Sequence, residues 1–553
     1  MKKAWWKEAV VYQIYPRSYM DSNGDGVGDI PGIISKLDYI KSLGVDIIWL
    51  CPVYESPNDD NGYDISDYRK ISEEFGGDPA FDELLEKIHG KGLKLVMDLV
   101  VNHSSDEHEW FEESRKSKDS PYRDYYFWKP GKDNGPPNNW TSFFSGSTWE
   151  YDSRTDEYFL HLFTKKQPDL NWENPKVRQE IYDVVDYWFK RGIDGFRMDV
   201  ISLISKQLEF EDASNPENYE ETIKTRYANG PRIHEFLQEM NKEVLSKYDI
   251  MTVGEGPGID LDNALFYVDD SRDELNMVFH FDHMFIDNGP GGKYDPIEMN
   301  FIRFKEVFSQ WDERLKGKGW GSIFLGNHDF SRMVSRFGSD SEFRVESSKM
   351  LAMLLLSMRG TVYVYQGDEI GMTNVAFPQI TDYNDVETLN SWKEAEERGE
   401  DMNAFMKLVH KQSRDNARTP MQWDSSQNAG FSSGTPWIKV NPNYEEINVA
   451  DQEPDSDSIL NFYRKMIAFR KNNPCLVYGD YQDLAPQHPS LFAFRRWDED
   501  SESLVLLNFS STELMADINV DFDKFEIAIS NMDEGADPKL LLPWQGILLK
   551  RIN

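Results

Sequence analysis

Short apolar runs alternate with longer amphipathic stretches through most of the chain. Eight of these runs are rich in β-branched and aromatic residues and have the length of buried strands. They lie at residues 10–15, 47–50, 95–101, 195–199, 251–253, 277–281, 323–325 and 361–365. Helical spacing of apolar residues falls between them, for example at 81–89, 177–190 and 344–356. This alternation predicts an α/β fold, a closed (β/α)8 TIM barrel of parallel strands.

Two departures from the alternation predict additional domains. The third strand ends near residue 103 and the fourth begins near 194, and the stretch between them is rich in Trp, Tyr, Asn, Gly and Pro. One helix cannot fill that gap, so we expect an inserted subdomain over the barrel mouth. From about residue 479 short strands replace the helices, which indicates a small antiparallel β domain. The predicted domains are the barrel at 1–103 and 175–478, the inserted subdomain at 104–174 and a C-terminal β-sandwich at 479–553.

The charge balance narrows the possible partners. The 553 residues include 97 Asp and Glu against 60 Lys and Arg, which gives a formal net charge of −37. Such a chain repels nucleic acid phosphates and anionic membrane surfaces, so we expect neither as a partner. A small neutral substrate, such as an oligosaccharide, fits this charge, and we expect a monomer or a weak homo-oligomer.

Cysteine usage and the N-terminus indicate a cytoplasmic protein. Cys51 lies in an apolar run, where a buried free thiol is expected; a disulfide with Cys475 is the alternative. The N-terminal segment carries Glu8 and has no long apolar region, unlike a secretory signal. The apolar run at 350–358 is too short to span a bilayer.

Three acidic residues close three short motifs at the ends of predicted strands. Asp199 ends GFRMD, Glu255 follows Gly in VGEG, and Asp329 ends GNHD. Barrels of this class place their chemistry at the carboxyl ends of their strands. Asp199 lies two residues after Arg197, so both side chains share a strand face, and we expect the guanidinium to keep the carboxylate ionised. This arrangement suits a nucleophile; a structural Arg–Asp pair is the alternative.

Cleavage of a glycosidic bond also needs a carboxylic acid that protonates the leaving oxygen, and a further carboxylate can oppose charge at the transition state. Glu255 and Asp329 suit these two roles. A general acid needs a raised pKa, and Glu255 has the small neighbour Gly256, which lets a substrate approach closely. Asp329 follows His328, a pair able to bind sugar hydroxyl groups, although NHD also occurs in capping turns. An ordinary loop position is the alternative for Glu255. Metal binding by His103 and His328 is a weaker interpretation, because no zinc-site spacing accompanies them.

A separate segment, DSNGDGVGD at 21–29, predicts a calcium site. Oxygen side chains occupy its first, third, fifth and ninth places, with Gly at the sixth and a carbonyl at the seventh, as in an EF-hand loop. The twelfth place is Gly32 instead of Glu and no helix is predicted before the loop, so we expect a structural Ca2+ loop of another kind. An Asx-rich turn without metal is the alternative, and we expect no organic cofactor. The expected ligands are Asp21, Asn23, Asp25, the Val27 carbonyl and Asp29.

Taken together, GFRMD, VGEG and GNHD in this order resemble the α-amylase superfamily of retaining glycoside hydrolases (family 13). DLVVNH (98–103), QPDLNW (167–172) and RDNARTPMQW (414–423) make the chain most similar to the oligo-1,6-glucosidase, α-glucosidase, dextran glucosidase and sucrose isomerase branch, over essentially its whole length. The resemblance implies Asp199 as nucleophile, Glu255 as acid/base and Asp329 as transition-state stabiliser. It also implies a glucose pocket, closed for exo attack by Asp60 and Arg414, whose lining is Asp60, Tyr63, His103, Phe144, Arg197, His328 and Arg414.

The residue after the nucleophile predicts the bond that is cleaved. Val200 in this place resembles the α-1,6-preferring members, while Ala accompanies α-1,4 preference, and a steric cause fits a branched side chain. We therefore expect an exo-acting oligo-1,6-glucosidase that uses double displacement, with its two catalytic carboxyl groups roughly 5–5.5 Å apart. Gly256 and Phe330 depart from the usual residues on the leaving-group side. An α-1,4-preferring or broad α-glucosidase, including sucrose hydrolysis, is the alternative.

Three further activities are less favoured. Many sucrose isomerases carry an Arg-rich RLDRD loop where this chain has HMFIDNG at 283–289. A phosphorylated sugar is disfavoured by the acidic balance and because no Arg/Lys cluster is evident at the expected barrel mouth. An inactive scaffold of the family would lose a catalytic carboxylate or gain a membrane anchor, and this chain keeps all three carboxylates.

Overall fold

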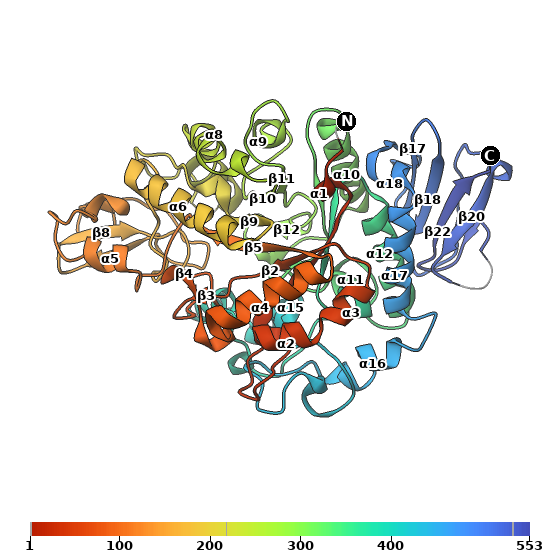
Figure 1. Ribbon diagram of the computed structural model, residues 1–553, viewed down its shortest axis with the longest axis horizontal. Coiled ribbons are helices and arrows are strands. Elements are labelled where there is room, and N and C mark those ends of the chain that lie inside the picture. Colours follow the sequence, from red (N-terminus) through yellow and green to blue (C-terminus); the bar gives the residue numbers. More distant parts are fainter. Residues whose placement is uncertain (1–2, 217, 533–535, 553) are drawn as a thin grey trace.

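The eight predicted strands form one parallel sheet that closes into a barrel (Figure 1). The structure is a computed structural model that describes residues 3–216, 218–532 and 536–552. In hydrogen-bonded order the strands are β11 (Met277–Phe279), β10 (Met251–Glu255), β9 (Gly195–Asp199), β5 (Lys94–Val100), β2 (Ile47–Leu50), β1 (Val10–Ile14), β15 (Thr361–Tyr365) and β14 (Ser322–Ile323). The ring closes between β14 and β11, where Ser322 Oγ donates to the Val278 carbonyl at 2.8 Å. The (β/α)8 fold is confirmed.

Helices follow each barrel strand and cover the outside of the sheet. In chain order they are α2 (Ile30–Ser35) with α3 (Leu37–Ser42), α4 (Gly77–Gly90), α6 (Pro175–Arg191), α8 (Ile233–Glu243), α9 (Ala264–Val268), α10 (Phe301–Leu315), α12 (Arg344–Ser357) and α17 (Ile459–Lys471). The ends of α6 follow from local sequence: Asn174 caps its first turn, Pro175 stands at its first position, and Gly192 ends it at φ 113°. The chain also forms short helices at α1 (Trp5–Glu8), α7 (Tyr219–Thr222), α11 (Met333–Phe337) and α18 (Pro474–Tyr478).

The stretch between β5 and α6 folds into a unit of its own at one end of the long axis (Figure 1). It contains α5 (Glu109–Ser114) and a three-stranded antiparallel sheet in the order β6 (Trp128–Lys129), β8 (Glu157–Leu160), β7 (Trp149–Asp152). Two small ribbons flank the barrel mouth: β3 (Tyr54–Glu55) with β4 (Asp67–Ile71), and β12 (Asn288–Gly289) with β13 (Gly292–Pro296). The segment after β15 adds α13 (Val386–Glu397), α14 (Met402–Gln412), α15 (Asp415–Arg418) and α16 (Val449–Gln452).

An antiparallel β domain ends the chain at the opposite end of the long axis (Figure 1). Its main sheet has the order β16 (Asp480–Asp483), β17 (Leu491–Trp497), β18 (Glu502–Asn508), β22 (Gly546–Arg551), β20 (Phe525–Ser530), and β19 (Leu514–Met515) pairs with β21 (Leu540–Leu541). This sheet packs on α12, whose residues from Ser347 to Ser357 are all buried. A helix that is buried on every face needs a second layer to cover it, and the β domain supplies that layer. The exact domain boundaries stay a prediction.

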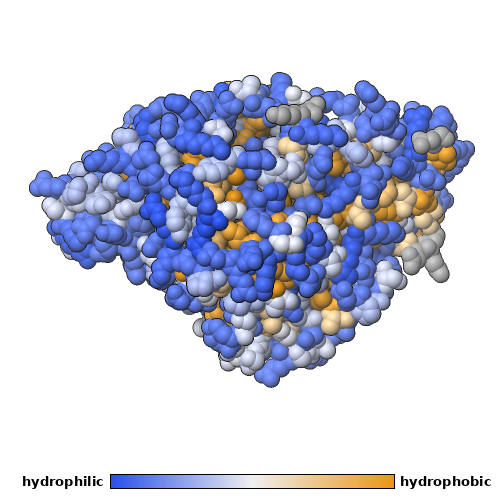
Figure 2. Space-filling model, viewed as in Figure 1, coloured by the Kyte–Doolittle hydropathy of each residue, from blue (hydrophilic) through white to orange (hydrophobic). Residues whose placement is uncertain are grey.

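Burial agrees with the remaining expectations from composition. Cys51 and Cys475 are both free and buried, so the expected thiol state of Cys51 is confirmed. Among the described helices none is long and apolar enough to cross a membrane. Figure 2 shows a face that is largely hydrophilic, with apolar residues in scattered patches, as the large excess of acidic side chains leads one to expect.

A buried carboxylate ties the β domain to the barrel and generates a prediction. Asp312 of α10 contacts Arg496 Nη1 of β17 at 3.1 Å and Arg359 Nη2 at 2.8 Å, and all three side chains are buried. The change Asp312→Ala leaves two buried guanidinium groups without this partner. We expect it to lower the free energy of unfolding by about 3 kcal/mol.

Urea unfolding followed by tryptophan fluorescence measures this loss. The control is Glu83→Ala, which removes the exposed pair between Glu83 and Lys87 on α4 and is expected to change the unfolding midpoint little. An Asp312→Ala midpoint equal to that of Glu83→Ala would show that the Asp312 cluster does not hold the two domains together.

Candidate active site

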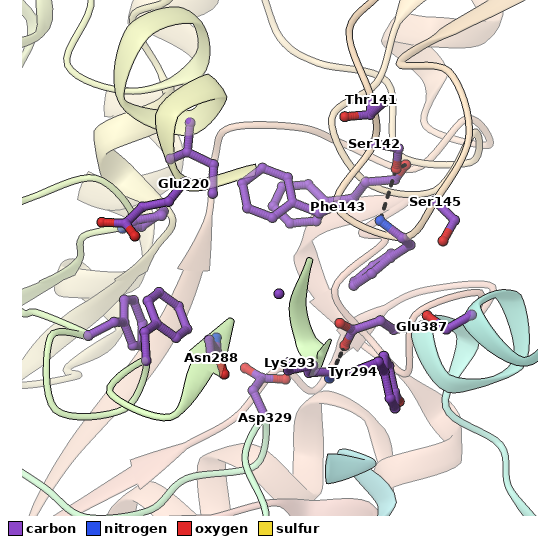
Figure 3. Close-up of a pocket in the computed structure, with 18 of the residues that line it drawn as sticks. Thr141, Ser142, Phe143, Ser145, Glu220, Asn288, Lys293, Tyr294, Asp329 and Glu387 are labelled. Atoms are coloured by element: carbon purple, nitrogen blue, oxygen red, sulfur yellow. Dashed lines mark hydrogen bonds and ion pairs between the residues drawn. The ribbon is translucent and has the colours of Figure 1, made fainter. Parts of the chain in front are cut away.

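The three predicted carboxylates line one cavity of about 560 Å3 at the carboxyl ends of the barrel strands. Asp199 and Glu255 are the last residues of β9 and β10, and Asp329 lies in the loop after β14. The roof comes from the inserted unit and the floor from the barrel. Figure 3 shows Asp329 on one side of the cavity, with Phe143 projecting from the opposite side. The barrel and the insert therefore build this site together.

A single guanidinium connects two of these carboxylates. Arg197 Nη1 lies 2.7 Å from Asp199 Oδ1, and Arg197 Nη2 lies 2.7 Å from Glu255 Oε2. Nη1 also contacts Asp98 Oδ1 at 2.6 Å. Arg197 is 1 % exposed and lies beneath the cavity instead of lining it. Its planar fork fixes the positions of both carboxyl groups at once.

Asp98 anchors Arg197 from inside the barrel. Its Oδ2 accepts hydrogen bonds from Trp49 Nε1 at 3.0 Å and from Tyr63 OH at 3.1 Å, while its Oδ1 faces Arg197. Asp98 is fully buried. The sequence places this residue at a strand end without a role, and the structure makes it the support of the guanidinium.

Burial controls the protonation of this group. Desolvation raises the pKa of the Asp199 carboxyl well above its usual value and also raises the pKa of Glu255, while Arg197 opposes both shifts. The predicted effect of Arg197 on Asp199 is therefore present, but burial outweighs it. Three carboxylates around one guanidinium favour keeping a proton within the group, because full ionisation would leave net negative charge in a buried site. Such a pair can present one ionised and one protonated carboxyl to a substrate.

Val200 adopts a backbone conformation that its side chain disfavours. Its φ of 36° and ψ of 41° lie in the left-handed region, which costs a β-branched residue about 1–3 kcal/mol. In this conformation the Val200 N–H donates to Glu255 Oε2 at 3.0 Å, and the side chain lines the cavity. Both recorded donors to Glu255, from Val200 and Arg197, reach Oε2, so Oε1 is the oxygen available for a proton.

Asp329 lies among donors that stabilise its negative charge. Arg418 Nη2 is 2.9 Å from its Oδ1, Arg414 Nη1 is 3.3 Å from the same atom, and His328 Nε2 is 3.1 Å from its Oδ2. Burial alone would raise the pKa of the Asp329 carboxyl, but the Arg414 and Arg418 guanidinium groups lower it well below its usual range, and His328 adds the contact from its Nε2. Asp329 is thus a fixed anion, in contrast to Asp199 and Glu255.

Arg414 closes one end of the cavity. Its Nη2 lies 3.4 Å from Asp60 Oδ1 and 2.7 Å from Asp385 Oδ1, and its guanidinium carbon lies 4.6 Å from the centre of the Phe144 ring. Asp385, which is fully buried, orients the guanidinium from behind. The Phe144 ring and the two contacts with Asp385 Oδ1 leave the Arg414 side chain little freedom, so this wall is rigid.

Two neutral histidines complete the wall around Tyr63. The His328 ring stacks on Tyr63 with centroids 5.2 Å apart and planes at 7°. His103 Nε2 lies 3.1 Å from the Tyr63 carbonyl oxygen. Burial lowers the pKa of His328 to about 3 and that of His103 to about 4, so both imidazoles are neutral near pH 7. In the described part of the chain no group of three or more His, Cys, Asp or Glu is placed to hold a metal ion.

The structure brings the predicted pocket residues together, with one difference in position. Arg197 supports the cavity from beneath, and the other predicted substrate-binding residues line it: Asp60, Tyr63, His103, Phe144, Val200, His328 and Arg414. Sequence reasoning missed Arg418, although it lies four residues after Arg414 in the same motif, where it ends the short helix α15 that Arg414 precedes as N-cap. Asp385 and Phe143 carried no signal, because their importance depends on contacts with distant segments.

The outer part of the cavity combines paired charges with aromatic rings. Lysines and arginines line it, but each has a carboxylate partner: Lys224 with Glu220, Lys293 with Glu387, Arg336 with Asp287, and Arg398 with Glu394 and Glu400. Figure 3 shows the Lys293–Glu387 contact across one wall. Phe281, Phe285 and Phe330 pack with centroids 5.4–6.0 Å apart, and Phe285 is 41 % exposed at the mouth. This mouth offers apolar faces and neutralised charges to a ligand.

Local packing explains why position 256 is a glycine. A Cβ at this position would lie 2.5 Å from Cδ1 and 3.0 Å from Cβ of Ile259. A larger residue therefore requires Ile259 to move, and both residues line the cavity next to Glu255. The departure of Gly256 from its usual residue type and the position of Ile259 belong together.

The predicted calcium loop wraps around the carboxylate of Asp21. Its oxygens accept from the backbone N–H groups of Asn23, Gly24 and Gly26 at 2.7–2.9 Å, and Asp29 caps α2 through Gly32 N at 2.6 Å. Asn23 Oδ1 and Asp25 Oδ1 each accept a hydrogen bond from within the loop. The oxygen-only donor set suits a hard cation such as Ca2+, although these hydrogen bonds also fit an Asx-rich turn.

Comparisons with known proteins agree on one family. The family profile described as "Alpha amylase, catalytic domain" matches residues 13–479. The oligo-1,6-glucosidase of Parageobacillus thermoglucosidasius is 56 % identical over 558 residues, covering 100 % of this chain and 99 % of that protein. The oligo-1,6-glucosidase of Bacillus cereus is 54 % identical over 556 residues and 100 % of both chains. The crystal structure of isomaltulose synthase from Klebsiella sp. LX3 superposes with a TM-score of 0.95 at 43 % identity over 100 % of both chains.

The shared guanidinium generates a prediction about pH. Arg197 lowers the pKa of Asp199 and of Glu255, so the change Arg197→Gln should raise both pKa values further. The acid limb of the kcat/KM profile for an α-glucoside is then expected to move to higher pH. We also expect kcat to fall about 10²–10³-fold, because the fork that orients both carboxyl groups is lost.

The matched variant is Arg197→Lys, which keeps a positive charge without the planar fork. It is expected to lose a similar factor in kcat while shifting the acid limb less than Arg197→Gln. An unshifted acid limb in Arg197→Gln would contradict the electrostatic role that the distances indicate.

Proposed function

The chain belongs to the α-amylase family, and on this basis we propose that it is an exo-acting, retaining oligo-1,6-glucosidase that releases terminal glucose from α-1,6-linked oligosaccharides. It is a glycoside hydrolase of this family. The observation that carries the proposal is the pair Asp199 and Glu255 on one guanidinium, facing a cavity that Arg414 closes. Two catalytic carboxyl groups in such a pair are the requirement of retaining glycoside cleavage.

The proposed reaction proceeds in two displacements. Asp199 attacks the anomeric carbon while Glu255 transfers its proton to the departing glycosidic oxygen, which forms a glucosyl–enzyme ester and frees the remaining sugar. Water then attacks the same carbon, Glu255 takes a proton from it, and glucose leaves with its α configuration kept. The fixed anion of Asp329 opposes the positive charge that develops on the ring between these states. The predicted separation of about 5–5.5 Å between the two carboxyl groups belongs to this mechanism.

The closed end supports exo attack. Asp60, Arg414 and the stacked Tyr63 and His328 rings form a wall at one end of the cavity, which supports the binding of a terminal residue there. Sugar C–H faces suit the rings, and the polar groups suit the hydroxyls. The rest of the substrate would extend toward Phe285 at the mouth, where the lysines and arginines are neutralised and a neutral aglycone fits better than a phosphorylated one.

The bond preference is proposed from Val200 and from the relatives. Val200 lines the cavity between the nucleophile and the leaving-group side, and its branched side chain occupies space that Ala would leave open. The relatives that cover the whole chain at 54–56 % identity carry the name oligo-1,6-glucosidase. A broad α-glucosidase that also hydrolyses maltose or sucrose is the alternative that Gly256 and Phe330 favour.

The test compares kcat/KM for isomaltose, maltose and sucrose, with products identified, in the wild type and in Val200→Ala. We expect isomaltose to be the best substrate and glucose the product. Val200→Ala should lower the isomaltose-to-maltose ratio about tenfold, because it removes two methyl groups from the discriminating wall. The ratio serves as its own control, since a general loss of activity leaves it unchanged. Maltose ahead of isomaltose in the wild type would replace this proposal with the broad α-glucosidase.

Identifying the products formed from sucrose also tests the sucrose isomerase alternative. A solved neighbour is an isomaltulose synthase, so its chemistry is the second candidate for this site. An isomerase would convert sucrose into an isomeric disaccharide, whereas the proposed hydrolase gives glucose and fructose. The HMFIDNG stretch supports hydrolysis over isomerisation, because it lacks the arginines of the RLDRD loop that many sucrose isomerases carry. Its Asp287 forms an ion pair with Arg336.

We also propose that the loop at 21–29 binds a structural Ca2+ and that the enzyme acts in the cytoplasm on small neutral oligosaccharides. Asp21, Asn23, Asp25, Asp29 and the Val27 carbonyl would hold the ion, which would neutralise their combined charge. The loop contacts the segment after β15 through Ser432 Oγ and the Asp21 carboxylate, so an ion here would stabilise that junction.

Ca2+ binding predicts a rise in thermal stability. Saturating Ca2+ should raise Tm by a few degrees over EDTA, since a ligand at 100 times its Kd contributes about 2.7 kcal/mol. Asp25→Ala should abolish the rise and leave hydrolysis unchanged, because Asp25 is exposed and is not among the residues that line the cavity. Glu86→Ala, which removes an exposed carboxylate from α4, is the control and should keep the rise. Equal Tm values in Ca2+ and EDTA would favour the Asx-rich turn.

A further inference from the structure

A buried lysine outside the cavity has all three of its N–H bonds engaged. Lys206 is 1 % exposed, and its Nζ lies 2.7 Å from Asp169 Oδ2, 2.8 Å from Asn102 Oδ1 and 2.6 Å from the Leu203 carbonyl oxygen. An ammonium group donates three hydrogen bonds and accepts none. The three acceptors come from the inserted unit, from the end of β5 and from the turn after β9, so Lys206 joins three parts of the molecule.

This lysine fixes the orientation of the Asn102 amide. The oxygen and the nitrogen of a side-chain amide have nearly the same size and position, so their partners must identify them. Here one partner is a donor and the other is an acceptor. Oδ1 faces the Lys206 ammonium, which can only donate, and Nδ2 faces Asp169 Oδ2 at 3.2 Å, which accepts. The reversed amide would place its N–H against the ammonium and its oxygen against the carboxylate. The Asn102 Nδ2 group therefore also donates to its other neighbour, His103 Nδ1, at 3.2 Å.

A ring nitrogen that accepts a hydrogen bond cannot carry the proton of a neutral imidazole. With Nδ1 of His103 accepting, the proton lies on Nε2, which faces the Tyr63 carbonyl oxygen at 3.1 Å. The neighbouring Gln167 amide is compatible with this assignment. Its Nε2 lies 3.2 Å from Asp60 Oδ2 and from the Tyr63 carbonyl oxygen, which together can take both of its N–H bonds, and 3.3 Å from His103 Nε2; its Oε1 accepts from Thr164 N.

The surrounding charges keep this imidazole neutral. Burial is the largest effect and lowers the pKa of His103 to about 4, Asp169 opposes it, and Lys206 adds to it. His103 is 1 % exposed yet lines the cavity. Its Nε2–H is consequently a neutral donor at the edge of the cavity, near the Asp60 and Tyr63 wall.

We propose that Lys206 and Asn102 are positioning residues that set the tautomer of His103, so that its Nε2–H, which faces the Tyr63 carbonyl oxygen in the free protein, is shared with a hydroxyl oxygen of the bound sugar. This inference rests on the proposed function for the identity of the ligand, while the tautomer is a property of the free protein. If Lys206 only held the insert on the barrel, a change at Asn102 would not alter which nitrogen of His103 is protonated. The two roles are therefore separable.

The experiment is 15N NMR of the histidine-labelled protein at pH 8, without substrate. In the wild type we expect His103 to show a protonated Nε2 and an unprotonated Nδ1, with its signal assigned by its loss in His103→Gln. Asn102→Asp keeps an acceptor for Lys206 but places a carboxylate oxygen against Nδ1. We expect this variant to move the proton to Nδ1 and to raise KM for isomaltose about tenfold with a smaller change in kcat, because one donor to the substrate is lost.

Tyr126→Phe is the matched control. Its hydroxyl contacts Ser104 Oγ at 2.7 Å at the same junction of insert and barrel, and no contact with His103 is recorded for it. It should leave both the tautomer and KM unchanged. A wild-type His103 protonated on Nδ1, or an Asn102→Asp protein that keeps the Nε2 proton and the wild-type KM, would overturn the inference. The predicted NMR spectra with no hydrolysis of any α-glucoside would instead refute the proposed function and leave the tautomer assignment standing.

Discussion

One guanidinium, that of Arg197, carries the electrostatic balance of the whole site. Three carboxylates meet it at 2.6–2.7 Å, and all four side chains are buried. Charges of one sign at this density repel strongly in a low dielectric, and only a delocalised cation with several N–H bonds can hold them in one plane. The cost of burying Arg197 is offset by Asp98, and the remaining imbalance keeps a proton within the pair of Asp199 and Glu255. The proposed acid and the proposed nucleophile thus depend on the same ion-pair cluster.

The barrel could be read from the sequence because its strands are buried on both faces. Such strands appear as continuous apolar runs, and Gly195–Asp199 and Thr361–Tyr365 begin and end where the runs do. The weakest case was the seventh strand, expected at 323–325 and observed at Ser322–Ile323, because a two-residue strand leaves little local pattern. The insert was visible only as an interruption; its three-stranded sheet depends on cross-strand contacts such as Tyr151 with Tyr158.

The candidate site was predictable where a motif is local and unpredictable where it depends on distant contacts. The positions of Asp199, Glu255 and Asp329 followed from their strand ends. The placement of Asp385 behind Arg414, and of Lys206 behind His103, needs segments that are far apart in the chain to meet. Charge counting had a related limit: the cavity mouth does contain lysines and arginines, and pairs such as Lys293–Glu387 neutralise them. Composition records the number of charges and not which of them are paired.

Val200 contacts both the cavity and Glu255, so it links the proposed bond preference to the environment of the Glu255 carboxyl. Sequence alone argues against a left-handed Val, since a β-branched side chain disfavours that conformation. Val200 nevertheless adopts this conformation, and its N–H consequently donates to Glu255 Oε2, the oxygen that Arg197 also contacts. The side chain that lines the cavity and the N–H that donates to Glu255 therefore belong to one residue. A change in the shape of that residue acts on the leaving-group side through its methyl groups and on Glu255 through its backbone, so the two properties are physically coupled at this position.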